Sequence, residues 1–381
     1  MADEPAQIEP ALQVQEPVET PDDGYSDAGS LHQSTSSLSS SIREYRTIRG
    51  RTFQTSNTID YWAPNDEQQI EGFDITHHFM MLLMDNHLFG APIQGRNLKV
   101  LDVGTGTGVW AIDVAEENED FDVIGIDISP IQPGWVPPNC QFFIDDAQLD
   151  WTFKPDEFDF IHARGLFGGI DNWQKLYDQA FRHLKPGGWF ESVEADSQVR
   201  SQNEEIEKDP KHVFKQWAPL FWQAGDIIGK TFRVAQDDGQ NPIIMETCMR
   251  RAGFVDIVHK KWRVPVGPWA KDPYLKEVGE YAGLYVDQGL EGWALRPLMQ
   301  CRTSTITWFT AESQRLETVV SGSHASHLVA YLGQTSGVTI TDIEHIKQRG
   351  NVTYVLCAKI KFHVRRKVTQ QLLTKTSGFA Q

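Results

Sequence analysis

The sequence predicts an α/β fold in which a mainly parallel sheet carries helices on both faces. Short apolar runs alternate with segments of helical periodicity between about residues 97 and 264, which is typical of right-handed βαβ units. The first apolar run leads directly into a glycine-rich turn that opens a helix. With 40% hydrophobic and 11% aromatic residues among 381, the chain can build a sizeable core. These observations together indicate a Rossmann-like, doubly wound sheet.

A helix is predicted before the sheet begins, from about Asp66 to Leu88, where apolar residues recur at helical spacing. Asn65-Asp66-Glu67 supplies side-chain acceptors and acidic residues at its start, and Gly90-Ala91-Pro92 ends it. We expect this helix to cap the α/β core.

The strands of the core follow in order. They are expected at residues 97–103, 121–128, 140–144, 158–163, 189–193 and 254–264, with helices at 108–117 and 173–183, a turn at 185–188 and a helix ending at Ala252-Gly253. Ligands of such sheets bind at the carboxyl ends of the strands. The site is therefore expected at that edge.

Two helical, tryptophan-rich segments, 200–250 and 270–345, interrupt the alternation, and residues 351–362 are a candidate last strand. Aromatic side chains in such attachments are more often core residues than ligand contacts. The predicted organisation is a disordered acidic and serine-rich tail (1–42), a helical N-terminal cap (43–95), the α/β core (96–270), a C-terminal cap with the last strand (271–362) and a basic flexible tail (363–381).

Composition excludes several classes of protein. The formal charge of −17 argues against nucleic acid or anionic lipid as the main ligand, because both are bound by clustered Lys and Arg. No run of about 18 apolar residues suggests a membrane span, and the first residues do not resemble a secretory signal. The four cysteines are widely separated, which argues against a disulfide scaffold or a cysteine metal site. We expect a cytoplasmic protein without a metal.

The two ends of the chain differ in charge. Residues 1–42 hold eight carboxylates and no Lys or Arg, and end in a serine run that suits a flexible linker or, alternatively, phosphorylation. The C-terminal residues include Arg365-Arg366-Lys367. We interpret this cluster as part of a solvated terminus. The alternative is a nuclear-import signal, which would imply a nuclear location.

The strongest chemical signal is the run Gly104-Thr105-Gly106-Thr107-Gly108 at the end of the first core strand. Its glycines permit the turn and let a ligand approach the backbone, and the following helix N-terminus offers N–H groups. Asp102 precedes the loop, and Asp127 ends the next strand, where a carboxylate accepts hydrogen bonds from ribose hydroxyls. The pattern indicates a cofactor that contains a nucleoside.

Two cofactor classes compete for this loop. A dinucleotide site requires glycine where this chain has Val109, and Asp102 would repel its pyrophosphate. S-adenosylmethionine carries no phosphate, its α-ammonium group favours a nearby carboxylate, and its carboxyl group favours the N–H groups of the loop. The sequence therefore favours S-adenosylmethionine over a nicotinamide cofactor.

Further runs lie at Tyr61 to Glu67, Phe158 to Arg164 and Phe181 to Trp189. With the glycine loop, and over about residues 45–269, they resemble the class I S-adenosylmethionine-dependent methyltransferases of filamentous fungi, particularly the LaeA-like and related secondary-metabolism group. The resemblance implies a seven-stranded sheet with an antiparallel last strand, and it fades beyond about residue 295.

The resemblance also implies roles for individual residues. The loop glycines would cradle the methionine part of the cofactor, Asp102 would lie near its amino group, Asp127 would bind the ribose and Asp146 the adenine amino group, with Asp145 as the neighbouring alternative. The predicted cofactor-binding residues are Asp102, Gly104, Thr105, Gly106, Gly108, Asp127, Ile128, Asp145, Asp146 and Ala147.

Three residues at the carboxyl ends of the fourth and fifth strands, His162, Arg164 and Glu194, are the candidate catalytic residues. Methyl transfer depends mainly on orientation in a dry pocket, and it requires a base only for a hydroxyl or protonated amine. His162 could act as a base or have a packing role, and Arg164 could pair with an acidic group of the acceptor or with Glu194. Glu191 is expected on the opposite face of its strand from Glu194.

Four residues before the core could cover the site. Tyr61 and Trp62 could cover the methyl donor, and they could equally well be core residues. His77 and His78 are adjacent on a predicted helix and point to different faces, so they suit lid residues better than ligands of one metal ion.

The predicted function is methyl transfer to an O or N acceptor, a small molecule of fungal secondary metabolism. The alternative is a LaeA-type nuclear regulator that keeps the cofactor fold and acts through protein partners.

Overall fold

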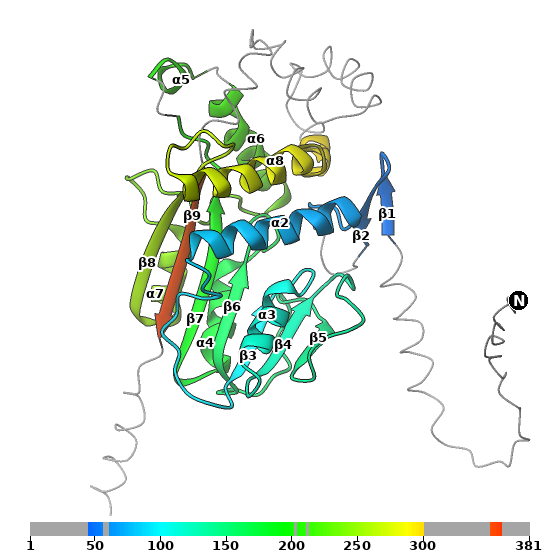
Figure 1. Cartoon of the computed structure of the whole chain (residues 1–381), viewed down its shortest axis with the longest axis vertical. Coiled ribbons are helices and arrows are strands. Elements are labelled where there is room, and N and C mark those ends of the chain that lie inside the picture. The colour runs from blue at the N-terminus through cyan, green and yellow to red at the C-terminus, as the bar shows by residue number, and fades with distance from the viewer. Residues whose placement is uncertain (1–44, 56–60, 202–203, 211–212, 301–350, 360–381) are drawn as a thin grey trace, which may run out of the picture. The chain divides into compact units, whose positions relative to one another are not determined.

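A seven-stranded sheet forms the centre of the chain, with helices on both of its faces (Figure 1). The structure is a computed structural model that describes residues 45–55, 61–201, 204–210, 213–300 and 351–359. The predicted tails, 1–42 and 363–381, lie outside these residues.

The sheet has the strand order β5-β4-β3-β6-β7-β9-β8. The first five of these strands pair in parallel, whereas β9 is antiparallel to both of its neighbours. The prediction of seven mainly parallel strands with an antiparallel last strand is therefore confirmed. The bounds are β3 (Lys99–Val103), β4 (Asp122–Asp127), β5 (Cys140–Ile144), β6 (Phe158–Arg164), β7 (Leu184–Asp196), β8 (Val255–Val264) and β9 (Asn351–Lys359).

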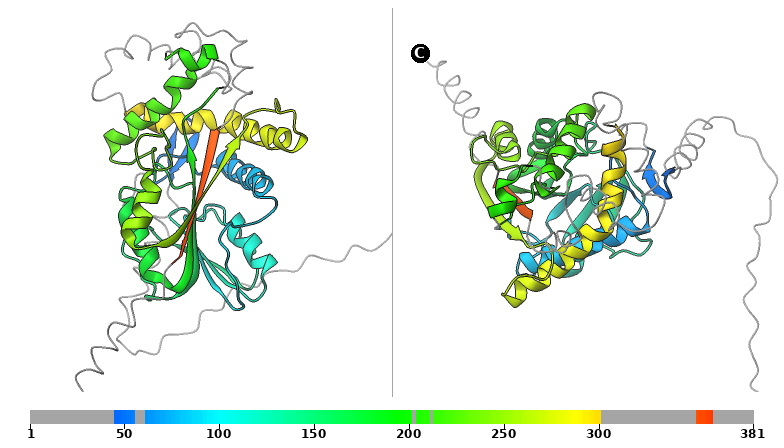
Figure 2. Two further views of the ribbon diagram at one scale, coloured as in Figure 1. Left: turned by 90° about the vertical axis from the view of Figure 1, so that its left-hand side faces the viewer. Right: turned by 90° about the horizontal axis from the view of Figure 1, so that it is seen from above.

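Helices cover the two faces of the sheet separately (Figure 2). On one face, α4 (Trp173–His183) and α7 (Ile244–Ala252) pack on Leu101 and Val103 of β3, and on the other α3 (Val109–Glu117) packs on Val100. Successive residues of a strand point to opposite faces, so β3 contributes to both cores. No helix among the described residues is long and apolar enough to cross a membrane.

Two further helices lie side by side across the carboxyl edge of the sheet (Figures 1 and 2). They are α2 (Glu67–Leu83) and α8 (Pro273–Gln300). The remaining helices are α5 (Glu204–Lys208) and α6 (Val213–Ile228). The part of the predicted segment 270–345 that follows Gln300 lies outside the described residues.

The helix α2 begins where the sequence predicts and ends earlier. Asp66 caps it by accepting a hydrogen bond from the backbone of Gln69, and the carboxylate also pairs with Arg51. The helix stops at Leu83 instead of Leu88, because Asp85 and Asn86 adopt left-handed backbone conformations with φ of 53° and 59°. The sequence did not predict the hairpin β1 (Tyr45–Ile48) and β2 (Arg51–Gln54) that precedes it.

The predicted turn at 185–188 is wrong, because the structure includes these residues in β7. Phe158 of β6 pairs with Leu184, and Phe160 pairs with Trp189, so β7 carries extra residues between the two pairs. A bulge of this kind absorbs a glycine with φ of 90°, Gly187, without ending the strand.

Candidate functional site

The glycine loop connects β3 to α3, and its three glycines have φ of +69°, +60° and +82°. A Cβ atom on Gly104 would come within 2.3 Å of Leu166, and one on Gly108 within 2.3 Å of Phe142. A Cβ atom on Gly106 would have its nearest neighbour 3.9 Å away, on Phe73. The outer glycines are therefore required by packing, whereas Gly106 borders space that the described residues do not fill.

The backbone N–H groups of this loop are used to fix its shape. Those of Gly104 and Thr105 donate to the carbonyl oxygen of Ile126, and that of Gly108 donates to Thr105. The N–H of Gly106 donates to the Asp127 carboxylate at 2.9 Å. The sequence predicts that the N–H groups of this loop bind the carboxyl group of the cofactor. In the structure, these four already have acceptors within the protein.

Asp102 is held at the base of the loop by two side chains. Its carboxylate accepts from the Thr105 hydroxyl at 2.6 Å, and it lies 2.8 Å from Nδ1 of His162. The His162 ring is buried and stacks on Trp110, with centroids 3.7 Å apart and planes 10° apart. His162 thus connects the predicted cofactor acid to α3.

The second acid, Asp127, ends β4. Its carboxylate also accepts from the N–H of Ser129 at 2.8 Å. Burial raises the pKa of Asp127 to about 6, although the hydrogen bonds from Ser129 and Gly106 lower it.

The loop after β5 carries the remaining predicted acids. The Asp145 carboxylate accepts from the N–H of Asp146, and the Asp146 carboxylate accepts from the N–H of Gln148. The other oxygen of Asp146, Oδ2, is buried and has no hydrogen-bond partner among the described residues. This unpaired oxygen and the space beside Gly106 both fit the adenosyl cofactor that the sequence predicts.

One cavity, about 300 Å³ in volume, brings the predicted residues together. Every predicted cofactor-binding and catalytic residue lines it except Gly108, which packs on Phe142 instead. Residues from α2, α8 and the segment before α2 complete the wall, so these elements form a roof over the glycine loop. Tyr61 and Trp62 belong to this roof, and the indole of Trp62 donates to the carbonyl oxygen of Phe167 at 3.1 Å.

The predicted alternative of an Arg164–Glu194 ion pair is wrong. Arg164 pairs in register with Val193, so its side chain and that of Glu194 leave the sheet on opposite faces. Glu194 instead accepts from the N–H groups of Leu166 and Phe167 at 2.9 and 3.1 Å.

The acids at this end of the sheet are held by backbone N–H groups. Burial raises the pKa of Glu194 to about 8, and its two backbone hydrogen bonds oppose the shift. Glu191 lies on the other face, as predicted, and accepts from the N–H groups of Gly90 and Ala91.

The adjacent histidines diverge as the sequence predicts. His77 lies 2.8 Å from the Asp113 carboxylate of α3, and the ring of His78 lies 4.2 Å from that of Tyr281. Among the described residues, no group of three His, Cys, Asp or Glu side chains is arranged to hold a metal ion.

Sequence reasoning missed two glutamines that support the loops of the site. Gln54 of the unpredicted hairpin donates to the carbonyl oxygen of Ile128 at 2.9 Å, and Gln132 donates to that of Gly106 at 2.6 Å. Gln54 is 74 residues from its partner in the sequence, so no local pattern could have indicated the first contact.

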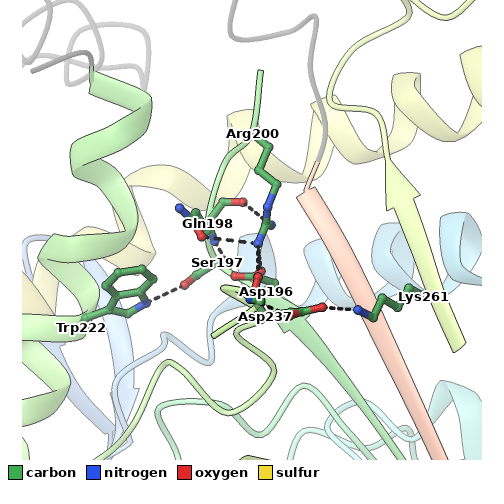
Figure 3. Close-up of polar contacts among 8 residues, drawn as sticks. Asp196, Ser197, Gln198, Arg200, Trp222, Asp237 and Lys261 are labelled. Carbon is green, nitrogen blue, oxygen red and sulfur yellow. Dashed lines mark hydrogen bonds and ion pairs between the residues drawn. The ribbon is translucent and has the colours of Figure 1, made fainter. Parts of the chain in front are cut away.

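A polar network lies at the end of β7 (Figure 3). Asp196, whose side chain is 1% exposed, pairs with Arg200 at 2.6 Å, and Arg200 also donates to the carbonyl oxygen of Asp237. The indole of Trp222 on α6 donates to the hydroxyl of Ser197, which lines the cavity. The segment after β7 is thereby connected to α6 and to the loop at Asp237.

Comparisons with known proteins agree with this architecture. Residues 76–231 match the family model for a methyltransferase domain. The methyltransferase pytC of Aspergillus terreus is 34% identical over 270 residues, which cover 70% of this chain and 80% of pytC. The secondary metabolism regulator LAE1 of Cochliobolus heterostrophus is 33% identical over 243 residues, covering 62% of this chain and 76% of LAE1.

Among solved structures, phosphoethanolamine N-methyltransferase 2 of Haemonchus contortus in complex with S-adenosyl-L-methionine is similar with 16% identity and a TM-score of 0.36, covering 76% of this chain and 52% of that one. The extent of the match to pytC is sufficient to assign the family. The chain belongs to the fungal class I S-adenosylmethionine-dependent methyltransferases that include pytC and the LaeA-like regulators.

Proposed function

We propose that this methyltransferase acts on a small, largely apolar molecule of secondary metabolism that presents a hydroxyl or amine group. The observation that carries the proposal is the cavity, which continues from the glycine loop into a wall of aromatic side chains. This wall comprises Tyr61, Trp62, Phe73, Phe167, Trp217, Phe221, Phe232, Tyr285 and Trp293. A concave site with an apolar wall and few polar groups is typical of small-molecule pockets.

The bound cofactor supplies an electrophilic methyl group on a sulfonium, and the chain orients the acceptor toward it. The aromatic wall excludes water and fixes the acceptor, an effect that accounts for much of the rate enhancement in such reactions. Trp62 packs against Phe167, Phe221 and Phe232 with ring centroids 5.2 to 6.2 Å apart, so the wall is a packed unit.

Glu194 is the candidate that receives the proton from an acceptor hydroxyl or ammonium. With a pKa of about 8, the ionised fraction of Glu194 that can accept a proton increases as the pH rises toward 8, and the carboxyl group lies in the wall of the same cavity. His162 is assigned a positioning role, because it holds Asp102 and is itself fixed by Trp110.

The test uses the purified full chain with S-adenosylmethionine labelled in the methyl group and a fungal cell extract separated into small molecules and macromolecules. Label is expected in the small-molecule fraction, and Asp127→Ala is the matched inactive control. Label in the macromolecular fraction alone would refute a small-molecule acceptor.

The alternative function is a nuclear regulator that acts through protein partners, which is favoured by the similarity to LAE1. It predicts nuclear fluorescence of a tagged chain and altered transcript levels on deletion. The proposed enzyme instead predicts a cytoplasmic protein and the loss of one methylated product. Cofactor binding without label in either fraction would support the regulator.

A further inference from the structure

Arg164 is a partly buried cation at the cavity wall that has no close carboxylate partner. It is the last residue of β6, and no carboxylate of the described residues lies within 4.0 Å of its guanidinium. Burial lowers the pKa of Arg164, while the more distant charges of Asp102, Glu191 and Asp113 raise it. Removing a cation even partly from water costs free energy unless an anion compensates it, so this position favours an anionic ligand.

The hydrogen bond that Arg164 makes fixes its orientation. Its Nη2 atom lies 3.2 Å from Nδ1 of His77. A guanidinium group can only donate, so Nδ1 accepts and the N–H at Nε2 of His77 donates to the Asp113 carboxylate, 2.8 Å away. The arginine is thus held by a chain of side chains from α2 and α3.

The register of the sheet places Arg164 beside the glycine loop. Val103 pairs with Ala163, so Arg164 follows at the level of Gly104. Arg164 and His162 occupy the same face of β6 because they are two residues apart, and His162 contacts Asp102. A carboxylate and a guanidinium therefore border the same end of the cavity, which suits the two charges of an α-amino acid.

Four of the five N–H groups of the loop Gly104 to Gly108 are already used within the protein. The N–H groups of Gly104, Thr105, Gly106 and Gly108 already have acceptors within the protein. An α-carboxylate at this end of the cavity would need another strong donor, and Arg164 supplies one in a geometry that can bind both carboxylate oxygens.

We propose that Arg164 binds the α-carboxylate of the methyl donor, and that His77 and Asp113 are positioning residues that direct its guanidinium toward the cavity. The inference rests on donor binding in this cavity, as the proposed function does. An acidic acceptor would present the same carboxylate chemistry, so the experiment separates the two sources.

The experiment measures binding by calorimetry with S-adenosylhomocysteine and with its decarboxylated analogue, S-adenosyl-3-thiopropylamine. Arg164→Gln is expected to bind S-adenosylhomocysteine roughly 10- to 100-fold more weakly than the wild type and to bind the analogue equally well. Arg164→Lys should retain part of the preference for the carboxylate. His77→Leu should lose part of it while Arg164 is unchanged.

The matched control is Arg250→Gln, which removes an exposed arginine of α7 paired with Glu246 and should alter neither affinity. Retention of the wild-type preference in Arg164→Gln would overturn the proposal. If Arg164→Gln kept that preference but no longer formed alkali-labile methyl esters, the partner of Arg164 would be the carboxylate of an acidic acceptor instead. Equal binding of the analogue reports that each variant is folded, and a wild type that binds neither compound would contradict the proposed function itself.

Discussion

Replacing Glu194 with glutamine should change the stability of the protein in a pH-dependent way. Glu194 is 1% exposed, and burial raises the pKa of its carboxyl group from 4.5 to about 8. Between these values the unfolded chain has released a proton that the folded chain retains, so this group makes the fold less stable as the pH rises from 4.5 to 8. At about 1.4 kcal/mol per pH unit, the loss approaches about 5 kcal/mol once the pH reaches the folded pKa.

Glutamine removes this penalty and costs one hydrogen bond. Its amide nitrogen cannot accept from the N–H of Leu166 or Phe167, a loss of about 1 kcal/mol. The two effects nearly cancel around pH 5.5, where we expect the variant and the wild type to be equally stable. At around pH 7.5, Glu194→Gln should be more stable by about 3 kcal/mol.

Urea denaturation at several pH values between these limits measures the difference. Glu157→Gln is a control in which the pH dependence of stability should have the opposite sign. Hydrogen bonds from Lys99 and Lys154 outweigh the burial of Glu157 and lower its pKa. That variant should be less stable than the wild type at neutral pH, with a gap that closes as the pH falls. A Glu194→Gln difference that stays constant across the series would refute the assignment of a buried, charge-penalised carboxylate.

Three further changes test the cavity and its supports. Gly106→Val should abolish binding of S-adenosylhomocysteine in calorimetry, because the valine side chain would enter the space beside the loop. The control is Gly134→Val, where an added Cβ atom would meet nothing within 4 Å, and this variant should bind as the wild type does. Asp146→Ala should bind S-adenosylhomocysteine about tenfold more weakly than the wild type does. It should bind the inosine analogue, which lacks the adenine amino group, as tightly as the wild type does. An equal loss of affinity for the two compounds would exclude a contact between Asp146 and the adenine amino group. Arg200→Gln should cost about 2 kcal/mol in urea denaturation, because the buried Asp196 carboxylate loses its charged partner and keeps only the hydrogen bond from the N–H of Gln198. Arg250→Gln at an exposed pair should cost less than about 1 kcal/mol. Similar costs for the two variants would show that the network contributes little to stability.

The fold was predictable because its signals are local. Each core strand is an apolar run that stops where the chain reaches the carboxyl edge, so the ends of β3 and β4 could be located from the sequence, and with them Asp102 and Asp127. The errors arose where local pattern and tertiary pairing disagree. Lys185 to Gly188 has the composition of a turn, yet neighbouring strands draw it into β7 as a bulge.

The sequence by itself determined the order of the core strands and helices along the chain, the cofactor class and most of the residues that border the cavity, since each depends on a local pattern. Only the tertiary structure decided which side chains meet. It separated Arg164 from Glu194 by strand register, and it brought His77 to Arg164 across 87 residues. Such contacts arise from the packing of whole elements, and the free energy that selects them is distributed over the core instead of being encoded at either residue.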